Sequence, residues 1–388
     1  MLMPSPNISA GRLRVLQAVF TMHSPETQEW LMSVWRGMDK ARYQFDFLVF
    51  EGAASPYDEE IKRLGGRLIP VPDVKNKRAF LRGVRKAMVE NGPYDIMHAH
   101  SFSLNGLIQK QAARAKIPVR LTHAHADRRK AQRNRTWRGR LYGWRSRALI
   151  DRYSTHGIAA TMEAASSLFG GRWWFDPRWQ IMPGGIDLAP FEREKNDLRP
   201  AWGLTPQSKV IGHIGDFRIE QNHDFLIAVF ERIAKADPTA VLLLIGEGPL
   251  RAQAEEKLAT KKLTPRVIFT GERADTADCL RAMDLFVYPA IYEGTGRHLI
   301  AAQAAGLPCI VSDALPQDLD IAKGSVAPLP LDAGIDPWVD KAREILAMPK
   351  PHAALTLDLI RASDHTLAAN IKSLSHLYER LYAERFGE

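Results

Sequence analysis

The stretch from Val210 to Asp313 decides the fold, because short apolar runs recur in it at regular intervals. It reads VIGHIGDFRIEQNHDFLIAVF (210–230), AVLLLIGEGPL (240–250), VIFTGERAD (267–275) and LFVYPAIYEGTGRHLIAAQAAGLPCIVSD (285–313). Helix-length segments separate the apolar runs from one another. Continuous apolar strands separated in this way are typical of a parallel sheet that is covered on both faces. The stretch therefore predicts a doubly wound α/β domain.

The same pattern occurs in the first half of the chain. It predicts further strands at Leu13–Phe20, Phe45–Phe50, Arg67–Val71, Asp95–His98, Val119–His123, Gly157–Thr161 and Gln180–Met182. The pattern restarts after Pro183–Pro190, a stretch that contains proline and glycine. We therefore expect an α/β fold with two doubly wound, Rossmann-like domains, residues 1–190 and 191–365. Because ligands bind at the carboxyl ends of such strands, we expect the two domains to face a central cleft.

The composition is that of an ordinary globular protein, with 388 residues, of which 45% are hydrophobic and 25% are charged. These values argue against disorder. Two cysteines, Cys279 and Cys309, exclude a disulfide scaffold and favour a reducing compartment. The N-terminal residues predict no signal peptide, and no segment approaches the roughly 18–20 apolar residues of a membrane span. We therefore expect a cytoplasmic protein.

The net charge of +9 is concentrated in one segment. Arg128–Arg152 contains ten basic residues and a single acid, whereas the rest of the chain carries as many acidic as basic groups. With Trp137 and Trp144 the segment predicts a basic helix with an aromatic strip, which is typical of a membrane surface. A solvated helix and an RNA patch are alternative interpretations. We favour an anionic membrane surface or acceptor, with peripheral attachment to the inner face of the cell membrane left open. Because no nucleic-acid-binding fold accompanies the segment, we expect no nucleic-acid partner.

The stretch that decides the fold also resembles the C-terminal domain of the family 4 glycosyltransferases with the GT-B fold, of the bacterial exopolysaccharide and capsule type. Earlier segments resemble the same group in order: YDIMHAHSF (94–102), LTHAHAD (121–127) and MPGGIDLAPF (182–191). The resemblance covers nearly the whole chain. It implies the transfer of a sugar from a nucleotide-sugar donor to a glycan or lipid-linked acceptor, with retention of configuration. It also implies that the C-terminal helix (366–388) packs back on the N-terminal domain.

The resemblance implies a set of functional residues. In the family a phosphate loop of the form G-R-F-x-x-x-K-N-H and an E-x7-E signature hold the donor. Matching and neighbouring positions give the donor-binding candidates Gly215, Phe217, Arg218, Asn222, Glu293, Gly294, Thr295 and Arg297. The catalytic candidates are His123 and Glu293. The nucleotide-diphosphate sugar is a co-substrate, and we expect no cofactor.

Four positions depart from the family pattern. Asp216 and Gln221 replace the arginine and lysine of the phosphate loop, so two cations that would neutralise a diphosphate are missing. Ala301 replaces the second glutamate of the signature, and Pro25–Glu26 stand in place of a Gly-Gly loop. Two alternatives therefore stay open. One is a catalytically degenerate partner or scaffold in glycan assembly, and the other is an enzyme that uses an unusual donor.

Two His-x-His pairs end neighbouring predicted strands, His98 with His100 and His123 with His125. Because side chains alternate along a strand, both members of a pair lie on one face of the sheet. Four convergent histidines could ligate Zn²⁺. The resemblance implies instead that they face the sugar, with His100 and His125 on the acceptor side, and we expect no metal. His98 is equally well interpreted as a structural residue.

Overall fold

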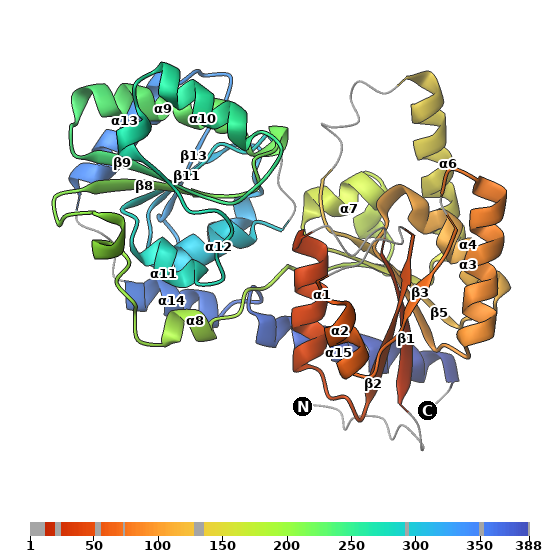
Figure 1. Ribbon diagram of the computed structural model, residues 1–388. Helices are drawn as coiled ribbons and strands as arrows, with labels where there is room; N and C mark the ends of the chain where they lie inside the picture. The colour runs from red at the N-terminus through yellow and green to blue at the C-terminus, as the bar shows by residue number, and fades with distance from the viewer. Residues whose placement is uncertain are drawn as a thin grey trace. The chain divides into compact units, whose positions relative to one another are not determined.

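The computed structural model describes residues 12–19, 25–50, 56–72, 74–127, 136–291, 295–348 and 353–386. The chain divides into two compact units (Figure 1). The first unit comprises Met1–Gly184 and Leu367–Glu388, and the second unit comprises Gly185–Thr366. The boundaries expected from the sequence, after residues 190 and 365, differ from these by a few residues.

The first unit contains a seven-stranded parallel sheet in the order β3-β2-β1-β4-β5-β6-β7. Its strands are β1 (Leu13–Val19), β2 (Tyr43–Val49), β3 (Leu68–Pro70), β4 (Ile96–Ala99), β5 (Val119–Ala124), β6 (His156–Ala159) and β7 (Trp179–Ile181). The strand order reverses between β1 and β4. In doubly wound sheets, ligands bind at the carboxyl ends of the strands beside this switch point.

Helices cover both faces of this sheet (Figure 1). They are α1 (Pro25–Gly37), α2 (Asp58–Arg63), α3 (Lys77–Asn91), α4 (Asn105–Arg114), α6 (Trp137–Tyr153), α7 (Met162–Phe169) and α15 (Leu367–Phe386), with short 3-10 turns at Phe102–Leu104 and Trp173–Phe175. Helices α1 and α15 share one hydrophobic core with the sheet, and α3 and α4 share the core on the other face. This arrangement explains why β1 is apolar on both faces.

Helix α15 contributes part of the core of the first unit although it comes last in the sequence. Leu374, Tyr378 and Leu381 are fully buried in the core that also contains Phe45 of β2. Burying each of these leucines contributes about 1.5–3 kcal/mol. The sequence SLSHLYERLY places these side chains at helical spacing on one face, so the apolar stripe alone explains the attachment.

The second unit contains a six-stranded parallel sheet in the order β10-β9-β8-β11-β12-β13. Its strands are β8 (Lys209–Ile214), β9 (Ala240–Ile245), β10 (Val267–Phe269), β11 (Leu285–Tyr288), β12 (Cys309–Ser312) and β13 (Val326–Leu329). The edge strand β13 was not expected from the sequence. It contains Pro328, and proline within a short apolar run argues against a strand except at an edge.

Helices cover this second sheet as well. They are α8 (Ala189–Glu192), α9 (His223–Ala236), α10 (Arg251–Thr260), α11 (Thr276–Arg281), α12 (Arg297–Ala304), α13 (Asp336–Ala347) and α14 (Ala353–Arg361), with 3-10 turns at Pro200–Trp202, Ile219–Gln221, Thr264–Arg266 and Gln317–Leu319. Helices α9 and α13 pack on one face, and α11 and α12 pack on the other. Helix α9 follows β8 and helix α12 follows β11, so both helices begin at the carboxyl edge of the sheet.

Candidate functional site

The two His-x-His pairs meet in the first unit, at the carboxyl ends of β4 and β5. The rings of His98 and His123 lie parallel to within 4°, with their centroids 5.3 Å apart. Within the pairs, the centroids of His98 and His100 are 4.1 Å apart, and those of His123 and His125 are 3.8 Å apart. His98 is completely buried and His123 is 3% exposed. The structure therefore brings together all four histidines that the sequence singled out, and we refer to them as the histidine cluster.

Side chains from three other elements hold the histidine cluster. The indole ring of Trp30 in α1 contacts the His123 ring edge-on at 5.1 Å, and its Nε1 donates to Oδ1 of Asn370 in α15 at 2.9 Å. Gln17 of β1 is within hydrogen-bond distance of His100, and Tyr378 of α15 is within hydrogen-bond distance of His98. Sequence reasoning missed these four residues, although a buried glutamine within the apolar run LRVLQAV is a signal that could have found Gln17.

Burial determines the charge of the cluster. Removal from water lowers the pKa of His98, His100 and His123 well below 6.5, and repulsion from other imidazoles of the cluster, His125 in each case, lowers it further. These three imidazoles are therefore neutral near pH 7. Nε2 of His98 and Nδ1 of His123 are buried and have no hydrogen-bond partner among the described residues. Neutral, unpartnered ring nitrogens can accept a proton, bind a hydroxyl group or ligate a metal.

A metal ion is one group that the histidine cluster could hold. One nitrogen each of His98, His100 and His123 lie within 4.8 Å of one another. Imidazole nitrogen in its neutral form is a preferred ligand of Zn²⁺ and other transition metals. The spacing is thus compatible with a metal, and the absence of one stays a prediction.

The donor-side candidates of the second unit lie on the loop between β8 and α9. Phe217 is completely buried and stacks on the ring of His223 at 4.1 Å. Asn222 adopts a left-handed conformation with φ +55, and its Nδ2 donates to the carbonyl of Pro289 at 3.1 Å. Both residues therefore shape the loop and tie it to the end of β11. A Cβ at Gly215 would lie 2.5 Å from Oε1 of Gln221, so a larger residue there would require the Gln221 side chain to move.

The loop carries two acids, Asp216 and Glu220, against one base, Arg218. Nε of Arg218 forms an ion pair with Oδ2 of Asp216 at 3.2 Å, with both side chains at least one-third exposed. Gln221, which stands where the family has lysine, is only 9% exposed. Oε1 of Gln221 and Nε2 of His213 have no partner among the described residues, and both lie close to Gly215. The loop therefore presents unsatisfied polar atoms but no net positive charge.

The second donor-side segment leads into α12. Gly296 adopts φ +64 at the N-cap, Arg297 is the first residue of the helix, and Thr295 is buried. Oγ1 of Thr295 has no partner among the described residues. The N-terminal N–H groups and the dipole of a helix favour an anion, and α9 and α12 both begin at this edge. Glu293 and Gly294 lie outside the described residues, and so do the side chains of Pro25 and Glu26 at the start of α1.

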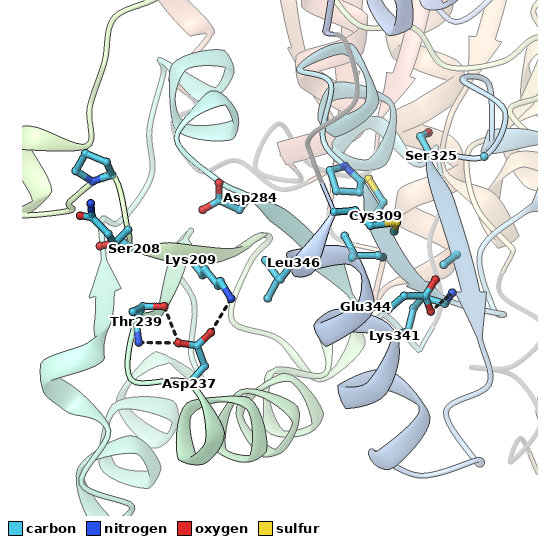
Figure 2. A pocket seen from close by; sticks show the side chains of 17 residues that line it. Ser208, Lys209, Asp237, Thr239, Asp284, Cys309, Ser325, Lys341, Glu344 and Leu346 are labelled. Carbon is cyan, nitrogen blue, oxygen red and sulfur yellow. Dashed lines mark hydrogen bonds and ion pairs between the residues drawn. The ribbon is translucent and has the colours of Figure 1, made fainter.

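A cavity lies at the opposite edge of the second sheet, near the amino ends of β8 and β12. Figure 2 shows Lys209, Asp237 and Cys309 among the residues that line its volume of about 830 Å³. Asp237 accepts from Thr239 and Lys209, and these hydrogen bonds lower the pKa of its carboxyl group to about 2. The charges here are satisfied locally, and the cavity lies away from the loop that carries Gly215. We therefore do not place the donor in it.

The described part of the basic segment forms α6. Trp137 is 69% exposed and Trp144 is 65% exposed. A small cavity of about 210 Å³ beside Trp144 is lined by Arg140 and Arg147. Residues 128–135 of the segment lie outside the described residues. Among the described helices, none combines the length and the apolar character needed to cross a membrane.

Comparison with known proteins supports the assignment that the two sheets suggest. The family described as "Glycosyl transferase 4-like domain" matches residues 28–178, and "Glycosyl transferases group 1" matches residues 208–344. A Bacillus subtilis protein named "Putative glycosyltransferase EpsF" is 33% identical over 96% of this chain and 97% of its own length. An Escherichia coli "UDP-Gal:alpha-D-GlcNAc-diphosphoundecaprenol alpha-1,3-galactosyltransferase" is 26% identical over 58% of this chain and 59% of its own length.

Solved structures share the fold. Anabaena Alr3699/HepE in complex with UDP-glucose has a TM-score of 0.77 and 14% identity, covering 95% of this chain and 99% of that chain. Sucrose-phosphate synthase from Thermosynechococcus elongatus has a TM-score of 0.74 and 17% identity, covering 96% and 100%. These likenesses confirm the expected fold class, two doubly wound Rossmann-like domains of the GT-B type. The chain therefore belongs to the family 4-like glycosyltransferases and is a transferase of the hexosyltransferase type.

Proposed function

We propose that this enzyme transfers a sugar from a nucleotide-diphosphate sugar to a glycan or lipid-linked acceptor in polysaccharide biosynthesis, with retention of anomeric configuration. The observation that carries the proposal is the identity to the Bacillus subtilis protein along almost the entire length of both chains. The Escherichia coli relative is named for a UDP-sugar donor and a diphosphoundecaprenol-linked acceptor, which supports the two substrate classes.

The donor binds at the carboxyl edge of the second sheet in this proposal. The diphosphate lies against the N-termini of α9 and α12, where backbone N–H groups converge, and Arg297 supplies a positive charge. Glu293, Gly294 and Thr295 contact the sugar or ribose. Gly215 supports this placement, because a side chain at its position would have to displace Gln221. Arg218 contributes only if it leaves Asp216, since the present ion pair satisfies both groups.

The acceptor binds at the carboxyl edge of the first sheet, against the histidine cluster. Neutral imidazoles both donate and accept hydrogen bonds, which suits a sugar hydroxyl group. We assign His123 as the catalytic histidine, and His100 and His125 as acceptor-side residues. Burial lowers the pKa of His123 well below 6.5, so it is available as a hydrogen-bond acceptor or base near pH 7.

An anionic membrane surface is a further partner in this proposal. The described part of the basic segment carries Arg140, Arg145 and Arg152 beside the exposed rings of Trp137 and Trp144. Such a helix is suited to lie at the interface of an anionic bilayer, where a lipid-linked acceptor is located.

One observation favours a second candidate, namely an enzyme with an unusual donor or a partner protein that has lost donor binding. The phosphate loop holds the Asp216–Arg218 ion pair and the buried Gln221 in place of two free cations. A loop without net positive charge binds a diphosphate more weakly, because charge-assisted hydrogen bonds are about twice as strong as neutral ones.

Thermal unfolding in the presence of UDP, GDP, dTDP and their sugar derivatives tests the proposed function and the second candidate together. A ligand that binds the native state at 100 times its Kd stabilises it by about 2.7 kcal/mol. We expect at least one nucleotide to raise the Tm of the second unit by several degrees, and Glu293→Gln to reduce that shift. The matched control is Glu256→Gln on the exposed face of α10. A folded protein that responds to none of the nucleotides contradicts the proposed donor and favours the second candidate.

A further inference from the structure

A chain of four hydrogen bonds connects three of the four histidines through two residues that are not histidines. Nδ1 of His100 is 2.8 Å from Nε2 of His125, and Nε2 of His100 is 2.9 Å from Oε1 of Gln17. Nε2 of Gln17 is 3.3 Å from the hydroxyl of Tyr378, and this hydroxyl is 2.7 Å from Nδ1 of His98. Gln17, Tyr378 and His98 are all completely buried. The order along the chain is therefore His125, His100, Gln17, Tyr378, His98, and we call it the relay.

Each member of the relay must donate in one direction and accept from the other. A neutral imidazole has one N–H and one bare nitrogen, a primary amide has one oxygen and one NH₂, and a hydroxyl donates a single hydrogen. Both His98 and His100 are neutral near pH 7, because burial lowers their pKa well below 6.5. Once one hydrogen bond of the relay has a direction, all four hydrogen bonds have that direction.

Two joint states satisfy this condition. In the first state Nε2 of His125 donates to Nδ1 of His100, and Nε2 of His100 donates to Oε1 of Gln17. Nε2 of Gln17 then donates to the hydroxyl of Tyr378, and that hydroxyl donates to Nδ1 of His98. All three histidines then carry their proton on Nε2. In the second state the amide of Gln17 is rotated by half a turn and every bond is reversed, so all three carry their proton on Nδ1. Each imidazole keeps one proton in both states, and the exchange of tautomers through solvent adds no net charge.

We propose that Gln17 and Tyr378 are positioning residues that couple the tautomers of His98, His100 and His125 into these two joint states. The amide of Gln17 transmits the direction of the hydrogen bonds but conducts no proton, because an amide does not readily give up its own. The group that meets Nδ1 of His125 selects the state, since this nitrogen is bare in the first state and protonated in the second.

The same rule, that each member of the relay donates in one direction and accepts from the other, disfavours a metal ion bound to His98 and His100 together. A metal on Nε2 of His98 requires the proton of that ring on Nδ1, where it is donated to Tyr378. A metal on Nδ1 of His100 requires its proton on Nε2, where it is donated to Gln17, whose NH₂ then also donates to Tyr378. The hydroxyl oxygen of Tyr378 would accept twice, and its hydrogen would find no acceptor among the relay members. Leaving a buried hydroxyl unsatisfied is unfavourable, because it loses its hydrogen bonds to water without replacement.

The charged groups near the relay offer no alternative explanation for the direction of its hydrogen bonds. Among the described residues, the charges that affect the pKa of His98, His100 and His123 belong to other members of the histidine cluster, and burial is the larger cause. On α15, the nearby acid Glu379 binds Tyr43 and Arg42 instead. Above the rings lies Trp30 of α1, whose indole N–H is donated to Asn370. The direction of the relay is therefore set within the relay and at its His125 end.

Long-range ¹H–¹⁵N correlation spectra of the ¹⁵N-labelled full-length protein at pH 7.5 measure the tautomer of each assigned histidine directly. We expect His98, His100 and His125 to show one shared tautomer in the protein without ligand, or two shared states in exchange. Mixed tautomers among the three in the unsubstituted protein refute the coupling. Because the readout needs no substrate, it is independent of the nucleotide-binding test of the proposed function.

Gln17→Glu provides the sharpest variant, because it replaces the amide by a group of the same shape that only accepts. The carboxylate then accepts from both His100 and Tyr378, and Tyr378 in turn accepts from His98. We expect the tautomers to split, with the proton of His98 on Nδ1 and those of His100 and His125 on Nε2. A folded Gln17→Glu protein in which all three tautomers still agree contradicts the inference.

Tyr378→Phe covers the case in which a carboxylate at position 17 prevents folding. It keeps the buried ring and removes the hydroxyl, so Nδ1 of His98 loses its partner. We expect the ¹⁵N shifts of His98 to change while His100 and His125 still share one tautomer. Tyr382→Phe, one turn further along the same helix, is the matched control and is expected to leave all three unchanged. Unaltered shifts of His98 in Tyr378→Phe rule out the relay.

Discussion

The guanidinium of Arg218 forms an ion pair with the carboxylate of Asp216, two residues before it, at a distance of 3.2 Å. In this loop the cation that could meet a donor phosphate is thus held by a neighbouring anion. We predict that Asp216→Asn increases the affinity for nucleoside diphosphates about 3- to 10-fold, because it releases Arg218 and removes a repulsive charge. Isothermal calorimetry with UDP or GDP measures the change.

The matched control for this prediction is Asp332→Asn, which makes the same change of charge at an exposed position of the second unit. A general electrostatic effect of net charge would improve affinity equally in both variants, and that outcome counts against a specific role of the Asp216–Arg218 pair.

Acid should destabilise the second unit through His223. Burial lowers the pKa of this imidazole from 6.5 to about 4. Between these two values the unfolded state binds a proton that the folded state does not, so the free energy of unfolding falls as the pH falls from about 6.5 to 4. At pH 5 the expected loss from this residue is about 2 kcal/mol relative to pH 7.5. Urea unfolding at the two pH values measures it.

The comparison for His223 is made with two variants. His223→Asn should show a smaller loss of stability between pH 7.5 and pH 5 than the unsubstituted protein does. His376→Asn, which changes an exposed histidine of α15, should leave the loss unaltered. Equal pH dependence in all three proteins would show that His223 is not buried as the structure has it.

Asn222 should matter for the stability of the phosphate loop. It combines φ +55 with a hydrogen bond to the carbonyl of Pro289, so alanine is unfavourable on both counts. We expect Asn222→Ala to lower the free energy of unfolding of the second unit by about 2 kcal/mol, whereas Asn222→Gly, which tolerates the backbone angle, should cost about half as much. Urea titration of the three proteins tests the order, and an alanine variant as stable as the glycine variant contradicts it.

Helix α6 should bind anionic vesicles. Replacing Arg140, Arg145 and Arg152 by glutamine should weaken co-sedimentation with phosphatidylglycerol vesicles more than 100-fold, because each basic residue near an anionic surface contributes about 1 kcal/mol. The matched control replaces Arg78, Arg82 and Arg85 of α3 in the same unit. Equal losses in the two triple variants indicate a general effect of charge, and no loss in either contradicts a membrane contact through α6.

Nucleotide binding should not require a divalent metal ion. We expect the purified protein to contain far less than one equivalent of zinc, and EDTA to leave nucleotide binding unchanged. The proposed donor site offers helix N-termini and Arg297 in the role that a metal plays elsewhere. Elemental analysis and calorimetry before and after chelation measure both quantities. A stoichiometric metal that is lost in His98→Asn, with His156→Asn as the control, would place an ion in the histidine cluster.

The regular recurrence of apolar runs in the sequence was sufficient to predict the fold. Strands such as Ala240–Ile245 are continuous apolar runs, and a parallel sheet covered on both faces requires this pattern. The strand Val326–Leu329 escaped detection because an edge position tolerates Pro328. The pairs His98–His100 and His123–His125 were identified because alternation along a strand is a local rule.

The residues that hold the histidine cluster could not be predicted in this way, because no local rule connects them with the histidines. Tyr378 and His98 are 280 residues apart in the sequence, and Asn370 and Trp30 are 340 residues apart. In the sequence Tyr378 is simply one member of an apolar helical stripe. The interaction of Arg218 with Asp216 was equally hidden, because the direction of a side chain on a loop does not follow from its position.

The placement of α15 has a consequence for the way this protein is made. The surface of the first sheet that Leu374, Tyr378 and Leu381 cover is complete only after α15 has left the ribosome. At roughly 5–20 residues per second, synthesis of the intervening second unit leaves that apolar surface uncovered for about 10–40 s. The first unit therefore completes its fold only after the second unit has been translated, and a nascent chain arrested before α15 is a natural client for chaperones.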